Sequence, residues 1–149
     1  MIAIVQRVIE AKVIVGDETV GAIGRGVVGL VAVTKADGRA EAEWMAAKLV
    51  GLRIFRADGK HFEADVKQIG GGILLVSNFT VSAKTRKGRR PSLDAAAEPT
   101  RADEAFNYLV ECVRKLNVPV ETGRFGADMR VHLINEGPAT FIVDSRATD

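Results

Sequence analysis

The chain has 149 residues, of which 47% are hydrophobic and 27% are charged, and its formal net charge is +2. This length suits one domain that buries roughly 70% of the surface exposed by its unfolded chain, so we expect a single soluble domain over residues 1–149. The small net charge gives no general case for nucleic-acid binding. The longest uncharged stretch, 68–83, is too short and too rich in glycine to cross a membrane, and we find no signal peptide in the sequence. We therefore expect a cytoplasmic protein with no membrane partner.

The first third of the chain has the alternating pattern of β-strands. Apolar residues alternate over 2–8, 13–15 and 19–23, and a continuous apolar run covers 27–33. This pattern predicts an antiparallel meander. The glycines of "GAIGRG" do not have the dinucleotide-binding spacing, and a strand follows where a helix would open, so we interpret them as turn residues.

Two segments have helical periodicity. The first covers 39–52. The second opens at Pro99-Thr100, with Thr100 as the predicted N-cap and Asp103 three residues later. Its apolar stripe consists of Ala102, Ala105, Phe106, Leu109, Val110, Val113 and Leu116. Both helices are expected to pack on the sheet.

Polar residues interrupt the strands elsewhere. Between the helices, "GGGILLVSNFTVSA" predicts a buried strand that carries polar residues at Ser77, Asn78 and Thr80. After the second helix the pattern predicts three more strands, with glycine breaks that include Gly137-Pro138. The expected fold class is therefore α/β, with mainly antiparallel strands and two main helices.

The segment 84–99 has no periodicity, and a loop of this length is usually functional or disordered. Its cations lie close together in "KTRKGRR" and have no acidic residue among them: Lys84, Arg86, Lys87, Arg89 and Arg90. A solvated structural loop and a phosphate-binding loop both fit this pattern.

Common catalytic groups are scarce. The chain has two histidines, His61 in a polar turn and His132 on a strand face expected to be exposed, and a lone Cys112 inside the second helix. These residues form no ligand set for a metal and no nucleophile–base pair, so we expect neither metal nor cofactor. The remaining polar segments are "SNFTV" and "NEGPAT", which favour catalysis by positioning and by backbone hydrogen bonds.

Several segments together resemble the bacterial-type D-aminoacyl-tRNA deacylases. They are "QRV" at 6–8, "LRIF" at 52–55, "SNFT" at 77–80, "TRKGRRPS" at 85–92, "PVETGRFGADM" at 119–129 and "NEGPATF" at 135–141. The resemblance extends over essentially the whole chain. It implies a homodimeric proofreading esterase that removes D-amino acids, and glycine mischarged on alanine tRNA, from the tRNA 3′ end. It also implies a β-barrel-like sheet with flanking helices.

The resemblance also implies roles for individual residues. The expected catalytic segment consists of Ser77, Asn78, Phe79 and Thr80, with Thr80 nearest the ester. An adenine pocket would use Phe79, Phe125 and Met129, and the cations Arg86, Lys87, Arg89 and Arg90 would meet tRNA phosphates. Without the resemblance, Phe79 and Phe125 are better interpreted as core aromatics.

Substrate selection is assigned by the resemblance to Asn135, Gly137, Pro138 and Arg7. In this family the Gly-Pro bond is cis, and its loop enters the active site of the partner subunit to exclude L-amino acids. Arg7 would hold that loop across the interface. The chain departs from the usual motifs at Asn78, where Gln is common, and at Ala139, where Val is common.

Two other functions fit the same residues. A non-catalytic RNA-binding module could use the basic loop and the aromatic residues after losing turnover through the changes at Asn78 and Ala139. A small-molecule esterase could use Ser77 or Thr80 as nucleophile, although the sequence offers no base beside them.

Overall fold

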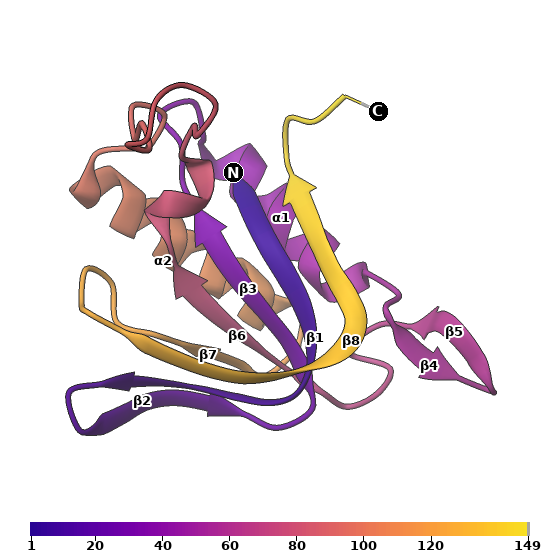
Figure 1. The fold of residues 1–149 in the computed structure, drawn as a ribbon. Helices are drawn as coiled ribbons and strands as arrows, with labels where there is room; N and C mark the ends of the chain where they lie inside the picture. Colours follow the sequence, from indigo (N-terminus) through magenta and orange to yellow (C-terminus); the bar gives the residue numbers. More distant parts are fainter. Residues whose placement is uncertain (149) are drawn as a thin grey trace.

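The computed structural model of the protein describes residues 1–148 (Figure 1). Its elements in chain order are β1 (Ile2–Val15), β2 (Glu18–Ile23), β3 (Gly26–Ala32), α1 (Arg39–Gly51), β4 (Phe55–Ala57), β5 (Lys60–Ala64), β6 (Gly72–Ser77), the 3₁₀ turn η1 (Phe79–Ser82), α2 (Pro99–Lys115), β7 (Val120–Thr122) and β8 (Arg130–Asp144).

One long strand, β1, organises the main sheet. Its first half pairs with β3 on one edge and with the second half of β8 on the other, and its second half lies between β2 and the first half of β8. All of these pairings are antiparallel. Beyond β3 the sheet continues through β6 and β7 in parallel, so the sheet is mixed and has the order β2-β1-β3-β6-β7.

The sheet curls until its two end strands approach each other. A Cβ added at Gly21 of β2 would lie 2.2 Å from the carbonyl oxygen of Thr122 in β7. Only glycine allows this close approach, because a larger residue would push β2 and β7 apart. The prediction of a barrel-like sheet is confirmed: the strands form a nearly closed barrel.

Two apolar cores lie on opposite sides of β3 and β6. The larger core is packed between the sheet and the two helices, and it includes Val5, Val31, Leu49, Leu75 and Leu109. The smaller one lies under the second half of β1 and contains Val8, Ala11, Val13, Val28, Leu74 and Val76. Figure 1 shows both helices on one side of β1, β3 and β6. The predicted pair of flanking helices is therefore confirmed.

The second helix begins earlier than its sequence pattern suggested. Glu98 is the N-cap and Pro99 occupies the first turn, so the prediction that Thr100 caps the helix is wrong. Proline suits this place because the first N–H groups of a helix have no partner within it. The apolar stripe is correct in its centre, where Ala102, Phe106, Leu109, Val110 and Val113 are buried.

The strands also differ from the prediction. The apolar strand ends at Ser77, so Asn78 and Thr80 lie in the turn that follows rather than in the strand. Two strands, not three, follow α2. Strand β8 continues through Gly137-Pro138, and the break predicted there is a bulge within this strand.

A small hairpin stands apart from the main sheet. Strands β4 and β5 pair only with each other and project from the side of the molecule where β8 bends (Figure 1). Among the described residues, no helix is both long enough and apolar enough to cross a membrane.

Candidate active site

A pocket of about 660 Å³ lies at the end of β6. Its walls come from the turn η1, the start of α2, and the segment between β7 and β8. The residues that line it are mostly apolar: Val33, Val76, Ser77, Asn78, Phe79, Thr80, Ala96, Ala97, Pro99, Ala102, Phe125, Gly126, Ala127, Asp128, Met129 and Val131. A few polar groups in an apolar hollow of this size are typical of a small-molecule or nucleotide site.

The polar wall of the pocket is the Ser77–Thr80 segment. The backbone N–H of Asn78 donates to the Val31 carbonyl at 2.8 Å, which ties the end of β6 to β3. The Thr80 hydroxyl donates to Oδ1 of Asn78 at 2.5 Å. Because an amide oxygen is not a base, this bond orients the hydroxyl without activating it as a nucleophile.

The aromatic wall is formed by Phe79 and Phe125. The Phe79 side chain is 55% exposed, so its interpretation as a core aromatic is wrong. Phe125 is half-buried and packs against the main core, and Met129, also half-buried, packs against the smaller one. The pocket therefore has an accessible aromatic face beside two supported apolar side chains.

The basic loop begins and ends at this pocket. Lys84 is separated by Ala83 alone from η1, whose Phe79 and Thr80 line the pocket, and Ala96 and Ala97 line the pocket at the far end of the loop. The loop is closed by two backbone hydrogen bonds of 2.9 Å between Lys84 and Ser92. Within the described chain, the cations Lys84, Arg86, Lys87, Arg89 and Arg90 are exposed and form no ion pair with a carboxylate.

The Gly-Pro segment lies in β8. Gln6 pairs with Thr140 and Val8 with Asn135, so residues 136–139 bulge out opposite Arg7 alone. The Gly137-Pro138 bond is cis, and both residues are exposed. Neither they nor the rest of this bulge line the pocket of their own chain.

Arg7 and Asn135 hold the bulge from beneath. Arg7 is buried, and its Nε donates to the Glu136 carbonyl at 2.8 Å while Nη1 donates to the Ile54 carbonyl at 2.6 Å. The Asn135 amide donates to the carbonyls of Arg7 at 3.0 Å and Ala139 at 3.2 Å. Arg7 therefore holds the bulge of its own chain.

The whole chain matches a known family. A sequence model described as D-Tyr-tRNA(Tyr) deacylase matches residues 4–144. The chain belongs to this family. It is 46% identical over 147 residues to a D-aminoacyl-tRNA deacylase of Geobacter sulfurreducens, covering 99% of this chain and 97% of the relative. It is 47% identical over 143 residues to the protein of the same name in Methylococcus capsulatus, covering 96% and 94%.

Solved structures agree with the fold. One named "c-Myc DNA Unwinding Element Binding Protein" superposes with a TM-score of 0.94 at 39% identity, covering 99% of this chain and 100% of that one. Another, named "Structural Analysis of a probable eukaryotic D-amino acid tRNA deacylase", has a TM-score of 0.81 at 16% identity, with 95% and 97% covered. At that identity the second likeness concerns the fold alone.

The family motifs are not all gathered in one place. The "SNFT" and "GRFGADM" segments meet in the pocket, and the cations of "TRKGRRPS" lie in the adjoining loop. The "NEGPATF" bulge and Arg7 form a second cluster outside that pocket.

Sequence reasoning missed Asp128 as a pocket residue. It is the only titratable side chain among the residues that line the pocket. Its position beside Met129 in the "GRFGADM" motif was the available signal, because that motif was already assigned to the adenine pocket through its neighbours.

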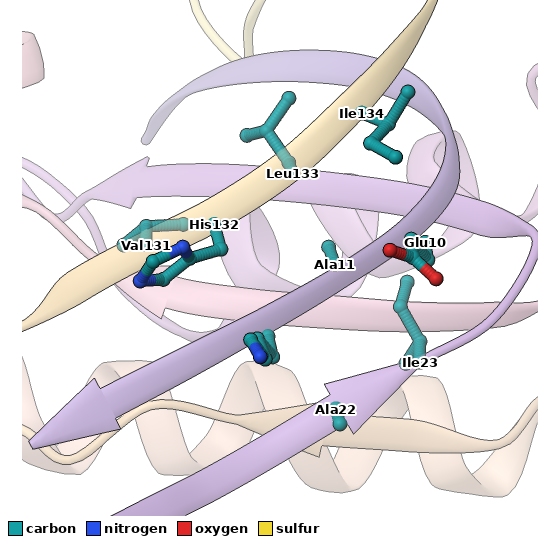
Figure 2. Close-up of a pocket in the computed structure, with 9 residues that line it drawn as sticks. Glu10, Ala11, Ala22, Ile23, Val131, His132, Leu133 and Ile134 are labelled. Atoms are coloured by element: carbon teal, nitrogen blue, oxygen red, sulfur yellow. The ribbon is translucent and has the colours of Figure 1, made fainter. Parts of the chain in front are cut away.

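A second hollow of about 570 Å³ lies on the outer side of the barrel (Figure 2). It runs along β1, β2 and β8, and Glu10, Ile23, His132 and Ile134 are among the residues that line it. It shares only Val131 with the pocket at Ser77–Thr80. His132 is exposed, as expected, and no family motif reaches this hollow.

Proposed function

We propose that the chain hydrolyses the ester of D-aminoacyl-tRNA to free D-amino acid and tRNA. The observation that carries this proposal is the family match over residues 4–144, joined to a pocket built from two of the family's motifs. We extend the proposal to glycine mischarged on alanine tRNA, since glycine has no side chain by which to be rejected. A proofreading enzyme for aminoacyl-tRNA would act in the cytoplasm, where charged tRNA is used.

The pocket is proposed to receive the 3′-terminal adenosine. Unstacked RNA bases are commonly held against aromatic side chains, and Phe79 offers an exposed ring at the mouth of an apolar hollow. Phe125 and Met129 also line this hollow. The ester on the terminal ribose would then lie near Ser77 and Thr80.

Catalysis is proposed to depend on positioning rather than on a side-chain nucleophile. Among the lining residues no histidine, cysteine or lysine is present to activate a hydroxyl. The N–H groups of Phe79 and Thr80 open the η1 turn and have no acceptor within it, so they are available to a developing oxyanion. The oriented Thr80 hydroxyl and the Asp128 carboxylate are the groups that can place the attacking water.

Selection against L-amino acids is assigned to the Gly137-Pro138 carbonyls of a second copy of the chain. Gly137 and Pro138 are exposed and do not line the pocket of their own chain, so they reach a pocket only by way of another molecule. In a twofold dimer this happens at both sites, because each copy inserts its bulge into the pocket of the other copy. Because the selecting atoms are backbone carbonyls, the selection does not depend on the chemistry of a protein side chain.

The basic loop is proposed to meet the phosphates of the tRNA acceptor end. Both of its ends border the pocket, and its exposed cations have no protein partner within the described residues. Contacts with phosphates give affinity without base specificity, which suits an enzyme that acts on many tRNAs.

The direct test is deacylation of matched D- and L-tyrosyl-tRNA, with glycyl-tRNA(Ala) as a third substrate. We expect rapid hydrolysis of the D-ester and the glycyl ester, and none of the L-ester above the spontaneous rate. Binding without turnover would instead support the RNA-binding module. Covalent capture of Ser77 or Thr80 by an acyl phosphonate would support the small-molecule esterase.

Mixed dimers test the exchange of bulges. Subunits carrying Thr80→Ala and subunits carrying Gly137→Ala, each expected to be strongly impaired alone, are unfolded together and refolded as a mixture. If each bulge serves the other subunit, mixed dimers hold one intact site and the sample recovers roughly a quarter of wild-type activity. No recovery, with mixed dimers present by mass spectrometry, would place the bulge outside the partner's site.

A further inference from the structure

The hairpin of β4 and β5 carries an aromatic residue in an unfavourable backbone conformation. Phe62 has φ of +54°, in the left-handed region that bulky residues rarely adopt, and its side chain is 46% exposed. An exposed hairpin position gains little from a phenyl ring in this conformation, which a glycine or asparagine would adopt more readily. The reason for a phenyl ring at this position therefore lies in its contacts.

The Phe62 ring covers Arg7. The Cζ atom of Arg7 lies 6.0 Å from the centre of the ring, within the range of a cation–π contact. The ring also meets Phe141 edge to face, with centroids 6.1 Å apart and planes at 79°. Because Phe141 follows Thr140 in β8, the ring touches the chain just after the Gly-Pro bulge.

Arg7 connects the hairpin to the bulge. One nitrogen of its guanidinium donates to Ile54, the residue before β4, and another donates to Glu136 at the start of the bulge. The guanidinium is planar and its donors have fixed directions, so holding the plane also sets where the Glu136 carbonyl lies. The Glu136 carboxylate adds a charge 3.7 Å from Nε.

We propose that Phe62 is a positioning residue for substrate selection. Its ring holds the Arg7 guanidinium, and through Arg7 it keeps residues 136–139 in the geometry that the partner's pocket requires. This inference rests on the proposed function of the bulge. It gives the hairpin, which lies outside the main sheet, a part in the discrimination between D- and L-esters.

The test compares Phe62→Ala with Phe62→Tyr, which keeps the ring, and with Lys60→Ala, a nearby change at an exposed position of the same hairpin. Two readouts are followed in each: the ratio of D- to L-tyrosyl-tRNA hydrolysis, and the ¹⁵N–¹H NMR signal of the Arg7 Nε–H that binds Glu136. The NMR signal needs no substrate, so it reports on the position of Arg7 in any case. Inactivity of the wild-type protein on both esters would refute the proposed function and would leave this test of positioning intact.

We expect Phe62→Ala to lower the D-ester rate about fivefold to tenfold at saturating tRNA, with KM little changed, and to broaden or shift the Arg7 signal. Phe62→Tyr and Lys60→Ala should behave as wild type in both readouts. An unchanged Arg7 signal in Phe62→Ala would overturn the proposal. A second outcome would also overturn it: Phe62→Ala loses activity, gel filtration shows dissociated subunits, and the Arg7 signal is retained. Phe62 would then be a subunit contact.

Discussion

The side-chain oxygen Oδ1 of Asn135 lies 2.8 Å from the point that a Cβ on Gly137 would occupy. A real Cβ cannot come so close, and the Asn135 amide is held by its bonds to the Arg7 and Ala139 carbonyls. The φ of Gly137 is outside the left-handed region, so glycine is required here by the close approach and not by its backbone conformation.

Gly137→Ala is therefore expected to displace the Asn135 side chain and reshape the bulge. D-aminoacyl-tRNA turnover should fall by at least tenfold, while the elution volume in gel filtration stays that of the unmodified protein, because the hydrogen bonds that break are local ones worth about 1 kcal/mol each. Gly24→Ala is the matched control, since a Cβ there meets nothing within 4 Å. Full activity in Gly137→Ala would mean that the bulge tolerates a different shape.

Thr80→Ala is expected to slow the hydrolysis step more than it weakens tRNA binding. The change removes the hydroxyl that Asn78 orients at the polar wall of the pocket. Single-turnover rates should fall about 10²-fold, in the range seen when one oriented polar group is removed, with tRNA affinity within about twofold. Thr19→Ala, at an exposed site in β2, controls for the removal of a threonine. Equal losses in rate and affinity would give Thr80 only a part in pocket shape.

Asn78→Gln adds the methylene that the family resemblance leads us to expect at this position. The longer side chain should keep the hydrogen bond with Thr80 after a small shift, so we expect the deacylation rate to stay within about threefold of the original. Asn78→Ala, which leaves the Thr80 hydroxyl unoriented, should be the slower variant. A rate for Asn78→Ala equal to that of the unmodified chain would remove the amide from the mechanism.

Removing the charges of Arg86, Lys87, Arg89 and Arg90 is expected to weaken tRNA binding and to flatten its salt dependence. For every phosphate that the loop no longer neutralises, the slope of log K against log salt should become shallower by about 0.9 on duplex and about 0.7 on single strands. The D/L preference should not change. Lys60→Ala with Lys67→Ala, at exposed sites that do not line the pocket, is the control. An unchanged slope in the quadruple variant would make the loop a solvated structural one.

Asp37 should contribute stability that depends on pH. Burial raises the pKa of this carboxyl, but hydrogen bonds from the Met1 ammonium and from Thr34 outweigh that effect, and the pKa lies below its ordinary value of 3.8. The folded protein therefore binds this proton more weakly than the unfolded chain does. The contribution is complete at pH values above 3.8 and is lost as the pH falls through the folded-state pKa.

Asp37→Asn should lower the free energy of unfolding at pH 7 by roughly 3–5 kcal/mol, because it leaves buried donors without their charged partner. Urea unfolding of both proteins at pH 7 and at successively lower pH measures the difference, which should shrink in acid. Asp17→Asn, in an exposed turn, should have no effect at either pH. A difference that stays constant as the pH falls would show that the carboxyl stabilises by packing and not by charge.

Local sequence patterns were enough to predict most strands, both helices and the family motifs. Alternation identified the strand segments and a period of 3.6 identified both helices, because these patterns reflect which side of each element is buried. The predicted antiparallel meander is wrong, since β3 pairs with β1 and not with β2. The sequence also singled out "SNFT" and "GRFGADM", whose residues line one pocket, and the basic loop, which adjoins that pocket. Thr100 was misassigned as a cap because Glu98 lacks the usual capping side chain, and Pro99 was the better signal.

Which motifs come together depends on long-range contacts that appear only in the folded chain. Strand periodicity cannot reveal that β8 runs past Gly137-Pro138 as one strand, since the bulge is defined by its pairing with Gln6 and Val8 across the sheet. It equally cannot reveal that Phe79 points to solvent or that Asp128 enters the pocket, because both follow from how η1 and the β7–β8 segment face each other. The link from Phe62 through Arg7 to Glu136 joins three segments far apart in sequence, and such contacts exist only once the chain has folded around the curved sheet.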